Sequence, residues 1–391
     1  MTLRGPMRAL RVALVAGETS GDQLGQALIT ALRERAPGAQ FCGVAGPLMQ
    51  AAGCEALAAA DELAVMGFVE PLAHLPRLWR LRRMLLRRLL QWQPDVFVGI
   101  DAPGFNLGLA AQFKAAGVKT VQYVSPQVWA WRQGRVRTIA RDCDLVLCLL
   151  PFEPAFYAAH AVKALFVGHP LADQIPLDSG QVAARLALGL DPGARVVALL
   201  PGSRRGEVQR LGAPYMQAAQ WLQSRRPDVQ FVAPMASAAA RALFDAHGAA
   251  AAGIRLLDGQ ARTALQAADA ALVTSGTATL EALLCGCPMV VAYKAAPLSA
   301  LLVRALIRVP YFSLPNLLAG ERLVPEFFQQ QVRGAALGAA LLAELEDAPR
   351  SDQLRARFRA IHATLAQGGA GRAAEGILQL LPGAGTLQVP A

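Results

Sequence analysis

Short apolar runs alternate with helix-like stretches along most of this chain. In the first part, runs rich in Val, Leu and Ala predict strands over Arg11–Ala16, Phe41–Val44, Val96–Ile100, Thr120–Tyr123 and Leu145–Leu149, with helices over Asp22–Ala36 and Leu107–Ala116 between them. Further along, the same pattern predicts strands over Val196–Leu200, Val229–Ala233, Ile254–Leu257, Ala270–Val273 and Met289–Ala292. Such alternation is typical of parallel sheets with helices on both faces. The pattern therefore predicts the α/β fold class.

The alternation pauses at Val167–Asp173 and then starts again. We therefore predict two doubly wound, Rossmann-type domains with a boundary near Pro170: residues 1–170 and residues 171–345. Residues 346–391 are predicted to be C-terminal helices and a tail. In doubly wound folds, ligands bind at the carboxyl ends of the strands. We expect the two sheets to face each other across a cleft, with the functional residues at these strand ends.

Composition and charge limit the function classes. The 391 residues are 54% hydrophobic, which is ample for large cores, and the formal net charge is +10. This charge indicates an anionic partner, and it does not choose among a membrane surface, a nucleotide and a nucleic acid. The six cysteines form no Cys-x-x-Cys pair and no metal-type spacing. They are predicted to be reduced core residues of a cytoplasmic protein.

No segment has the pattern of an export signal or a membrane span. The apolar run Val12–Ala16 is interrupted at once by Gly17–Asp22. The most apolar later stretch, Pro288–Phe312, is broken by charged residues and prolines. We therefore expect a protein that does not cross the membrane.

Two turns in the second half have the pattern of phosphate-binding turns. The strand Ala270–Val273 is followed by Ser275, Gly276 and Thr277, where a helix begins whose first N–H groups have no partner within the helix. Glu281, just inside this helix, is placed to accept from a ribose hydroxyl. An ordinary capped helix explains this turn equally well.

The second turn follows Val196–Leu200 and contains Gly202, Ser203 and Arg204. The Arg204 guanidinium is a fixed cationic fork that suits phosphate oxygens, although a basic surface loop is the alternative. The sequence has neither a Walker-type P-loop nor a Gly-x-Gly-x-x-Gly fingerprint, so neither a P-loop NTPase nor a dinucleotide-binding dehydrogenase is indicated.

Polar residues also follow the predicted strands of the first half. Asp101 directly follows Val96–Ile100, and Glu18 follows the first strand at the same edge. A carboxylate at this position can take the proton of a sugar hydroxyl that attacks an electrophile. A helix-capping Asp is the alternative. A further loop after a strand contains Ser125, Gln127 and Trp129, which are predicted to line an acceptor pocket or, alternatively, to be packing residues.

The chain resembles the lipid-A-disaccharide synthase family, glycosyltransferase family 19, over about Val12 to Phe328. The segments that carry the resemblance are residues 16–22, 66–70, 99–103, 125–131, 168–171, 200–204 and 274–281. The resemblance implies an inverting glycosyltransferase with the two-domain GT-B fold. Such an enzyme joins UDP-2,3-diacylglucosamine to 2,3-diacylglucosamine 1-phosphate (lipid X), giving the β-1,6-linked lipid A disaccharide 1-phosphate of lipopolysaccharide biosynthesis, and UDP.

The resemblance also implies roles for individual positions. Asp101 matches the catalytic carboxylate, and Glu18, in the family's first acidic loop, is the second residue predicted to be catalytic. The implied donor site comprises Gly202, Ser203, Arg204, Ser275, Gly276, Thr277, Glu281 and Asn316. Gly104 stands where the family commonly has an acidic residue, so a second carboxylate is missing there. The implied mechanism uses no metal and no cofactor, and it leaves open whether the protein forms a homodimer.

The stretch Arg77–Leu90 predicts a basic amphipathic helix. Leu78, Leu81, Leu85 and Leu89 share one face, and Arg80, Arg83 and Arg87 line the opposite one. With lipid substrates, this helix is predicted to bind the inner-membrane surface as a peripheral element. The alternative is a helix that packs on the sheet with a solvated arginine face.

Two other functions stay open at this point. A UDP-N-acetylglucosamine 2-epimerase has the same two-domain architecture and needs no acyl acceptor. A nucleic-acid-binding protein is the second alternative, but the chain has no recognisable RNA motif and only 6% aromatic residues. We therefore expect no nucleic-acid partner.

Overall fold

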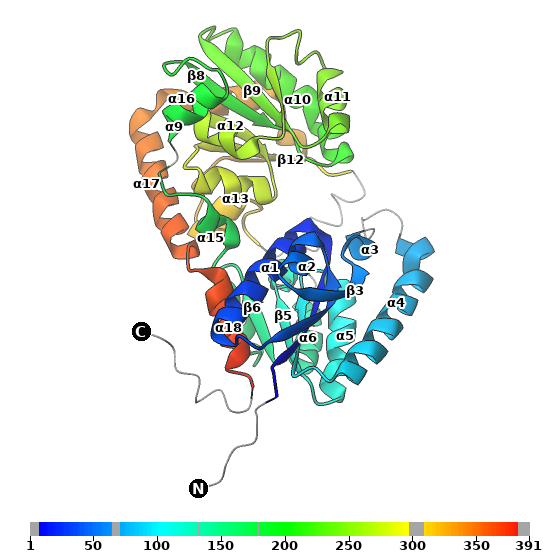
Figure 1. Cartoon of the computed structure of the whole chain (residues 1–391). Coiled ribbons are helices and arrows are strands. Elements are labelled where there is room, and N and C mark those ends of the chain that lie inside the picture. The colour runs from blue at the N-terminus through cyan, green and yellow to red at the C-terminus, as the bar shows by residue number, and fades with distance from the viewer. Residues whose placement is uncertain (1–7, 65–70, 132, 179, 297–308, 382–391) are drawn as a thin grey trace. The chain divides into compact units, whose positions relative to one another are not determined.

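The computed structural model describes residues 8–64, 71–131, 133–178, 180–296 and 309–381 (Figure 1). Residues 66–70, and residues 297–308 of the apolar stretch Pro288–Phe312, both used above, lie outside these ranges. The chain divides into two compact units. Unit 1 comprises residues 1–170 and 366–391, and unit 2 comprises residues 171–365.

Unit 1 is built on a seven-stranded parallel sheet with the order β3-β2-β1-β4-β5-β6-β7. Its strands are β1 (Arg11–Ala16), β2 (Gln40–Ala45), β3 (Cys54–Ala59), β4 (Val96–Ile100), β5 (Lys119–Tyr123), β6 (Leu145–Cys148) and β7 (Ala164–Phe166). The helices before the boundary are α1 (Glu18–Arg35), α2 (Pro47–Ala51), α3 (Asp61–Ala64), α4 (Pro71–Trp92), α5 (Pro103–Ala115), α6 (Val136–Asp142) and α7 (Glu153–Ala158), with 3-10 turns at Gln127–Trp129 and Gln133–Arg135.

Both faces of this sheet are buried. Alternate residues of β1 point into two separate apolar clusters, one shared with α1 and the other with α4 and α5. The C-terminal helix α18 (Gly369–Leu378) lies beside α1 and adds Ala373 and Ile377 to the first cluster (Figure 1). The central strands are therefore continuous apolar runs, as expected for a parallel sheet.

Unit 2 has a six-stranded parallel sheet with the order β10-β9-β8-β11-β12-β13. Its strands are β8 (Arg195–Leu200), β9 (Val229–Met235), β10 (Arg255–Asp258), β11 (Ala270–Thr274), β12 (Met289–Tyr293) and β13 (Glu326–Phe328). The helices of this part of the chain are α8 (Pro170–Gln174), α9 (Gln181–Ala187), α10 (Arg205–Gln223), α11 (Ala238–Asp245), α12 (Ala261–Ala267), α13 (Thr277–Leu284), α15 (Leu314–Ala319), α16 (Gly334–Glu346) and α17 (Ala348–Leu365), with a 3-10 turn at Gln329–Gln331.

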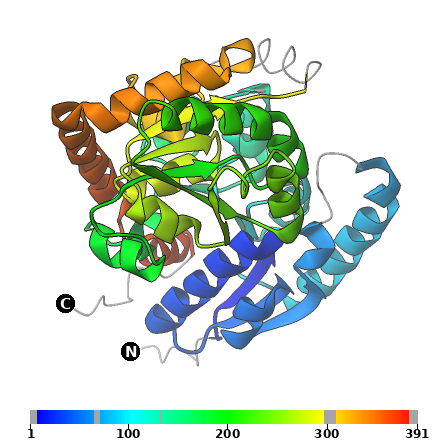
Figure 2. The same cartoon turned by 90° about the horizontal axis from the view of Figure 1, so that it is seen from above.

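Helices α10 and α16 run side by side over one face of this sheet (Figure 2). They approach closely because Gly338 of α16 has no side chain: a Cβ there would lie 2.6 Å from Trp221 of α10. Val208, Leu211 and Leu341 of the two helices bury their side chains against the strands. The outcome is a second α/β core, so the predicted fold class of two parallel, Rossmann-type sheets is confirmed.

The C-terminal helices, predicted above as a segment of their own, are shared between the units. Helix α17 contacts α13 and α16 and belongs to unit 2, whereas α18 belongs to unit 1. The division follows the apolar contacts, because the buried apolar side chains of α18 belong to the unit 1 cluster named above.

Candidate functional site

The first candidate site lies at the carboxyl edge of the unit 1 sheet. Ala16 pairs with Ile100, and Ile100 pairs with Tyr123, so β1, β4 and β5 end side by side. The strand order reverses between β1 and β4, which makes this edge the switch point where doubly wound folds bind ligands. Glu18 and Asp101 follow these two strands and are brought to the same place, as predicted.

Strained backbone is concentrated at this edge. Glu18, Asp101, Ala102 and Val124 have φ angles of 62°, 52°, 41° and 71°, in the left-handed region that favours glycine. Each such residue costs on the order of 1–3 kcal/mol, and a β-branched residue is a particular outlier. Strain of this kind persists only where surrounding contacts hold it, and it clusters at active sites.

Amide side chains hold the turn that carries Asp101. The Asp101 N–H donates to the carbonyl oxygen of Tyr123 at 2.8 Å. The Asp101 carbonyl oxygen accepts from Asn106 Nδ2 at 2.8 Å and from Gln122 Nε2 at 3.1 Å. Both amides are fully buried. The backbone of Asp101 is therefore fixed from three sides, and its carboxyl group is left half-buried at the edge.

The environment of Asp101 suits a base. Burial raises the pKa of its carboxyl group above the ordinary value, and a hydrogen bond from the Ala102 N–H opposes this shift. A carboxylate with a raised pKa takes up a proton more readily. The loop with Glu18 lies close by, because a Cβ on Gly17 would be 3.3 Å from the Cβ of Ala102. The Glu18 side chain is exposed.

The side chains predicted to line an acceptor pocket, in the loop after β5, do not all point outward. Ser125 and Trp129 are buried, and only Gln127 of the three predicted acceptor residues is exposed. The indole Nε1–H of Trp129 donates to Glu153 Oε1 at 3.0 Å. The hydroxyl groups of Ser125 and Tyr157 are 3.0 Å apart. Two of the three side chains therefore point into the unit rather than outward.

Three residues at this edge were not found from the sequence: Asn106, Gln122 and Glu153. Gln122 lies within a predicted strand and Asn106 lies just before a predicted helix, and nothing in the pattern marks either amide. Glu153 had a usable signal, because it follows the predicted strand Leu145–Leu149 at the same edge of the sheet. A charged residue within a few positions of a predicted strand end is the signal that indicates such a residue.

The second candidate site lies at the carboxyl edge of the unit 2 sheet. Leu200 pairs with Val273, so the turns after β8 and β11 are neighbours at the second switch point. The hydroxyl group of Thr274 donates to the Leu200 carbonyl oxygen at 2.9 Å and joins the two strand ends. Gly202 and Gly276 have φ angles of 117° and 146°, so both turns use glycine for their positive φ. The predicted donor turns are therefore brought together.

The turn after β8 already holds a carboxylate. Glu207 Oε2 accepts the N–H groups of Ser203 at 3.1 Å and Arg204 at 3.2 Å. Gly202 permits this approach, because a Cβ there would lie 2.5 Å from the Cβ of Glu207. The Arg204 side chain is 78% exposed. What this turn offers to a ligand is the guanidinium group rather than its backbone N–H groups.

The N-terminus of α13 is the more open of the two turns. Gly276 and Thr277 are exposed, and the first N–H groups of a helix have no acceptor within it. The Ser275 hydroxyl group donates to the Phe312 carbonyl oxygen at 2.8 Å, which ties the turn to the segment before α15. Glu281 is partly buried; burial raises the pKa of its carboxyl group, and Arg262 opposes this shift.

Asn316 is a buried framework residue of this edge. Its Nδ2 donates to the Val324 carbonyl oxygen at 3.0 Å and to Glu326 Oε1 at 2.9 Å. Its Oδ1 accepts the N–H groups of Leu323 at 2.8 Å and Val324 at 2.9 Å. All four hydrogen-bonding positions of the amide are thus used within the protein. The structure places Asn316 so that it shapes the loop between α15 and β13.

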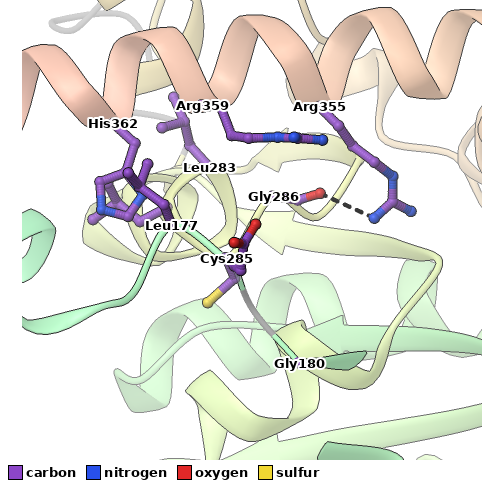
Figure 3. Close-up of a pocket in the computed structure, with 10 residues that line it drawn as sticks. Leu177, Gly180, Leu283, Cys285, Gly286, Arg355, Arg359 and His362 are labelled. Carbon is purple, nitrogen blue, oxygen red and sulfur yellow. Dashed lines mark hydrogen bonds between the residues drawn. The ribbon is translucent and has the colours of Figure 1, made fainter. Parts of the chain in front are cut away.

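A cavity of about 210 Å³ lies at the other end of α13, away from Gly276. Arg355, Arg359 and His362 of α17 line it, together with Cys285 and Gly286 (Figure 3). Arg355 donates to the Gly286 carbonyl oxygen at 3.4 Å. None of the catalytic, donor-binding or acceptor-binding residues predicted from the sequence lines this cavity. It is therefore separate from both switch points.

Helix α4 has the predicted amphipathic form. Leu81, Leu85 and Leu89 are buried in the unit 1 core, whereas Arg80, Arg83 and Arg87 are exposed. Trp79 is 58% exposed, and the Arg83 guanidinium lies 4.8 Å from its ring centroid. The leucine face is therefore occupied by the protein's own core, and the surface that remains accessible is the arginine face with Trp79.

Among the residues that the structure describes, no group of three or more His, Cys, Asp or Glu side chains is arranged as metal ligands are. Within the same ranges, no helix has the length and hydropathy to cross a bilayer.

Solved structures with this fold include enzymes that use sugar nucleotides. A UDP-GlcNAc 2-epimerase from Neisseria meningitidis has a TM-score of 0.62 at 12% identity and covers 95% of this chain and 99% of its own. The calicheamicin glycosyltransferase CalG4 has a TM-score of 0.56 at 17% identity and covers 95% of this chain and 98% of its own. At such identities the likeness shows the fold alone.

Sequence relatives are far more similar. The lipid-A-disaccharide synthase of Alkalilimnicola ehrlichii is 53% identical over 382 residues, 96% of this chain and 100% of its own. That of Chromohalobacter salexigens is 51% identical over 376 residues, 95% of this chain and 97% of its own. The family model described as Lipid-A-disaccharide synthetase matches residues 12–376. A match of this extent, on a fold with two switch-point sites, shows that the chain belongs to the lipid-A-disaccharide synthase family.

Proposed function

We propose that this protein joins UDP-2,3-diacylglucosamine to 2,3-diacylglucosamine 1-phosphate, forms the β-1,6-linked lipid A disaccharide 1-phosphate, and releases UDP. The observation that carries this proposal is the family match over residues 12–376, with relatives about half identical to the chain. The two switch-point sites support it, since one offers a carboxylate and the other offers groups that bind phosphate.

Asp101 is the general base in this proposal. It takes the proton of the acceptor 6-hydroxyl group as that oxygen attacks the anomeric carbon of the donor. The bond from that carbon to the UDP oxygen breaks on the opposite face, and its electron pair leaves with UDP, so the configuration inverts. The raised pKa of Asp101 and its fixed backbone favour this role. Glu18, exposed on the neighbouring loop, is assigned to binding at the same site.

The donor diphosphate is assigned to the N-terminus of α13 and to Arg204. Negative charge builds up on the leaving diphosphate, and groups aimed at that charge stabilise the transition state. The N–H groups of Gly276 and Thr277 and the exposed Arg204 guanidinium fit this task. Glu207 already occupies the backbone N–H groups after Gly202, so those are not assigned to the phosphate. Glu281 is assigned to the ribose.

An epimerase function is the second candidate, and the fold likeness to a UDP-GlcNAc 2-epimerase is the observation in its favour. That likeness comes at 12% identity, whereas the family relatives reach 53% over their full length. An epimerase also needs no acyl acceptor. The disaccharide reaction is therefore the function that the observations support best.

The test is a mass-spectrometric assay with purified protein, UDP-2,3-diacylglucosamine and lipid X in detergent micelles. We expect disaccharide 1-phosphate and UDP from the wild type, and a loss of roughly 10²–10⁴-fold in kcat for Asp101→Asn. Asp95→Asn is the matched control, because Asp95 lies just before β4, at the opposite end of the same strand. Full activity of Asp101→Asn would remove Asp101 from the mechanism, and a UDP-sugar epimer instead of disaccharide would establish the second candidate.

The membrane contact is assigned to the arginine face of α4, in a protein that binds the cytoplasmic face of the inner membrane peripherally. Both proposed substrates carry acyl chains, and basic side chains beside an exposed tryptophan suit anionic headgroups. Arg83→Glu with Arg87→Glu is expected to abolish flotation with anionic liposomes. The matched control is Arg225→Glu with Arg359→Glu, which changes the net charge equally at two exposed arginines of unit 2. Equal loss of flotation in both pairs would leave only a net-charge effect.

A further inference from the structure

One buried carboxylate joins two loops at the carboxyl edge of unit 1. Glu153, the first residue of α7, is 3% exposed. Its Oε1 accepts from Trp129 Nε1–H at 3.0 Å, in the loop after β5. Its Oε2 accepts from the Leu150 N–H at 2.9 Å, in the loop after β6. A single side chain therefore ties together the ends of two neighbouring strands.

The side chains around Glu153 pack against the buried side of the loop Ser125–Ala130. The Ser125 hydroxyl lies 3.0 Å from Tyr157 OH, and it also forms a hydrogen bond that stabilises the charged form of Glu153. The Trp129 ring meets Phe152 edge to face at 4.9 Å. These contacts turn the Ser125 and Trp129 side chains inward and hold the segment that contains the 3-10 turn Gln127–Trp129 at both ends.

The same loop is joined to the turn that carries Asp101. Gln122 Nε2 lies 3.1 Å from the carbonyl oxygen of Asp101 and 3.3 Å from that of Val124. Val124 holds a left-handed φ of 71° directly before Ser125. Gln127 is the exposed residue of the loop, at the edge where Asp101 also lies. The position of Gln127 relative to Asp101 is therefore set by the bonds behind it.

We propose that Glu153, in its ionised form, is a positioning residue that holds the loop Ser125–Ala130 in the shape that binds the acceptor sugar beside Asp101. Glu153 itself touches no substrate in this proposal. The proposal rests on the proposed function, because it names the acceptor as the ligand of this loop.

The charge state of Glu153 follows from its surroundings. The N–H groups of Leu150 and Trp129 point at it as donors, and the titratable groups nearest to it are Tyr157 and Cys148. Burial raises the pKa of Glu153 to about 7, against the opposing effect of the donors. A proton on the carboxyl group would replace an acceptor position with a donor. We therefore expect the KM for the acceptor to rise as the pH falls through about 7.

The decisive variant is Glu153→Gln, which places an amide NH₂ group against donors. Loss of one buried acceptor is worth about a factor of ten, so we expect the acceptor KM to rise roughly tenfold, with kcat and the donor KM changed much less. The dependence of the acceptor KM on pH near 7 should also vanish. Trp129→Phe keeps a ring but removes the donor, and should shift the acceptor KM in the same direction by a smaller factor.

The matched control is Glu344→Gln. Glu344 of α16 is also a buried glutamate with a pKa raised by burial, but it lies in unit 2 and bonds to Arg350 at 3.1 Å. We expect this variant to keep the acceptor KM and its pH dependence. A rise in acceptor KM equal to that of Glu153→Gln would show a general effect of lost buried charge, and would overturn the proposal.

Hydrogen exchange of the peptide that spans Ser125–Ala130 gives a readout that does not need activity. We expect faster exchange in Glu153→Gln and Trp129→Phe, and no change in Glu344→Gln. Unchanged exchange in the first two would refute the anchoring, and faster exchange with an unchanged acceptor KM would refute the link to the acceptor. A wild type that makes no disaccharide would overturn the proposed function, and this assignment with it, whatever the exchange data show.

Discussion

The carboxyl group of Glu153 is expected to make the stability of unit 1 depend on pH. Its pKa is about 7 in the folded protein and 4.5 as the ordinary value. At about 1.36 kcal/mol for each pH unit, this difference is worth about 3 kcal/mol. The side chain is almost fully buried, so no discount for solvent screening applies.

The sign follows from proton binding. Between pH 4.5 and 7 the folded chain holds a proton on Glu153 and the unfolded chain does not, so folding is favoured at the acidic end of this range. The contribution is fully present below pH 4.5, falls as the pH rises towards 7, and is absent above it. The wild type should lose about 3 kcal/mol of unfolding free energy across this window from Glu153 alone.

Thermal unfolding of the wild type and Glu153→Gln, measured from pH 4.5 to 8.5, isolates this effect. Burial also raises the pKa of Asp101, Glu281 and Glu344, and these slopes are common to both proteins. The difference between the two melting temperatures should therefore change with pH by about 6–12 °C for a unit of this size, in favour of the variant at high pH.

A difference in melting temperature that stays flat across the range would refute the reasoning, since Glu153 would then titrate alike in both states. A second variant guards against misfolding of the first. Trp129→Phe removes a donor that stabilises the charged form, so the pKa of Glu153 should rise further and the loss of stability should extend to higher pH.

Four further outcomes are expected. Arg185→Met should cost about 3–5 kcal/mol in urea unfolding, because the buried Arg185 is bonded to Asp269 at 2.8 Å and the variant leaves that carboxylate unpaired. Asn106→Leu should lower kcat and the melting temperature together, because the Asp101 carbonyl oxygen loses a donor at 2.8 Å. Gly104→Asp should fold and keep its activity in the disaccharide assay, because a Cβ there meets no atom within 4 Å. An acidic side chain in the first turn of α5 should also raise the unfolding free energy by about 0.3–1 kcal/mol. Prior treatment with a chelator should leave turnover unchanged, since the proposed mechanism puts no metal on the diphosphate.

The strands that the sequence pattern does not predict lie at sheet edges. β3, β7 and β13 each end the strand order of their sheet, whereas the predicted runs all correspond to strands. An interior strand of a parallel sheet is buried on both faces and forms a continuous apolar run. An edge strand is only partly covered, and the side chains of β7 and β13 are all half-buried. Each of these two strands is also only three residues long, which is shorter than the apolar runs on which the prediction depends.

The two candidate sites were also predictable only in part. That Glu18, Asp101 and the turns of unit 2 would gather at strand ends follows from the rule that parallel strands end at one edge, and it needs no detail of packing. The direction of a loop side chain is different, because it depends on partners far away in sequence. Trp129 turns inward because Glu153 accepts the hydrogen bond from its indole N–H. The Asn316 side chain is turned inward because its amide bonds to the backbone of the loop around Val324. No local pattern contains these partners.

The turns at the two candidate sites reach positive φ with different residues, and the difference follows from the groups that each site is proposed to offer to its ligand. The unit 2 turns use Gly202 and Gly276 for positive φ, which costs little. The groups proposed to bind phosphate there are the N–H groups at the start of α13 and the Arg204 guanidinium, and neither needs a side chain at the glycine itself. At the unit 1 edge the proposed base, Asp101, is itself a residue with positive φ, so the proposed mechanism excludes glycine at this position. The strain is then held by buried amides, from Asn106 and Gln122, that bond to the Asp101 carbonyl oxygen. In the proposed mechanism, the edge that offers a base thus needs a supporting set of hydrogen bonds, whereas the edge that binds phosphate uses glycine turns, a helix N-terminus and the Arg204 guanidinium.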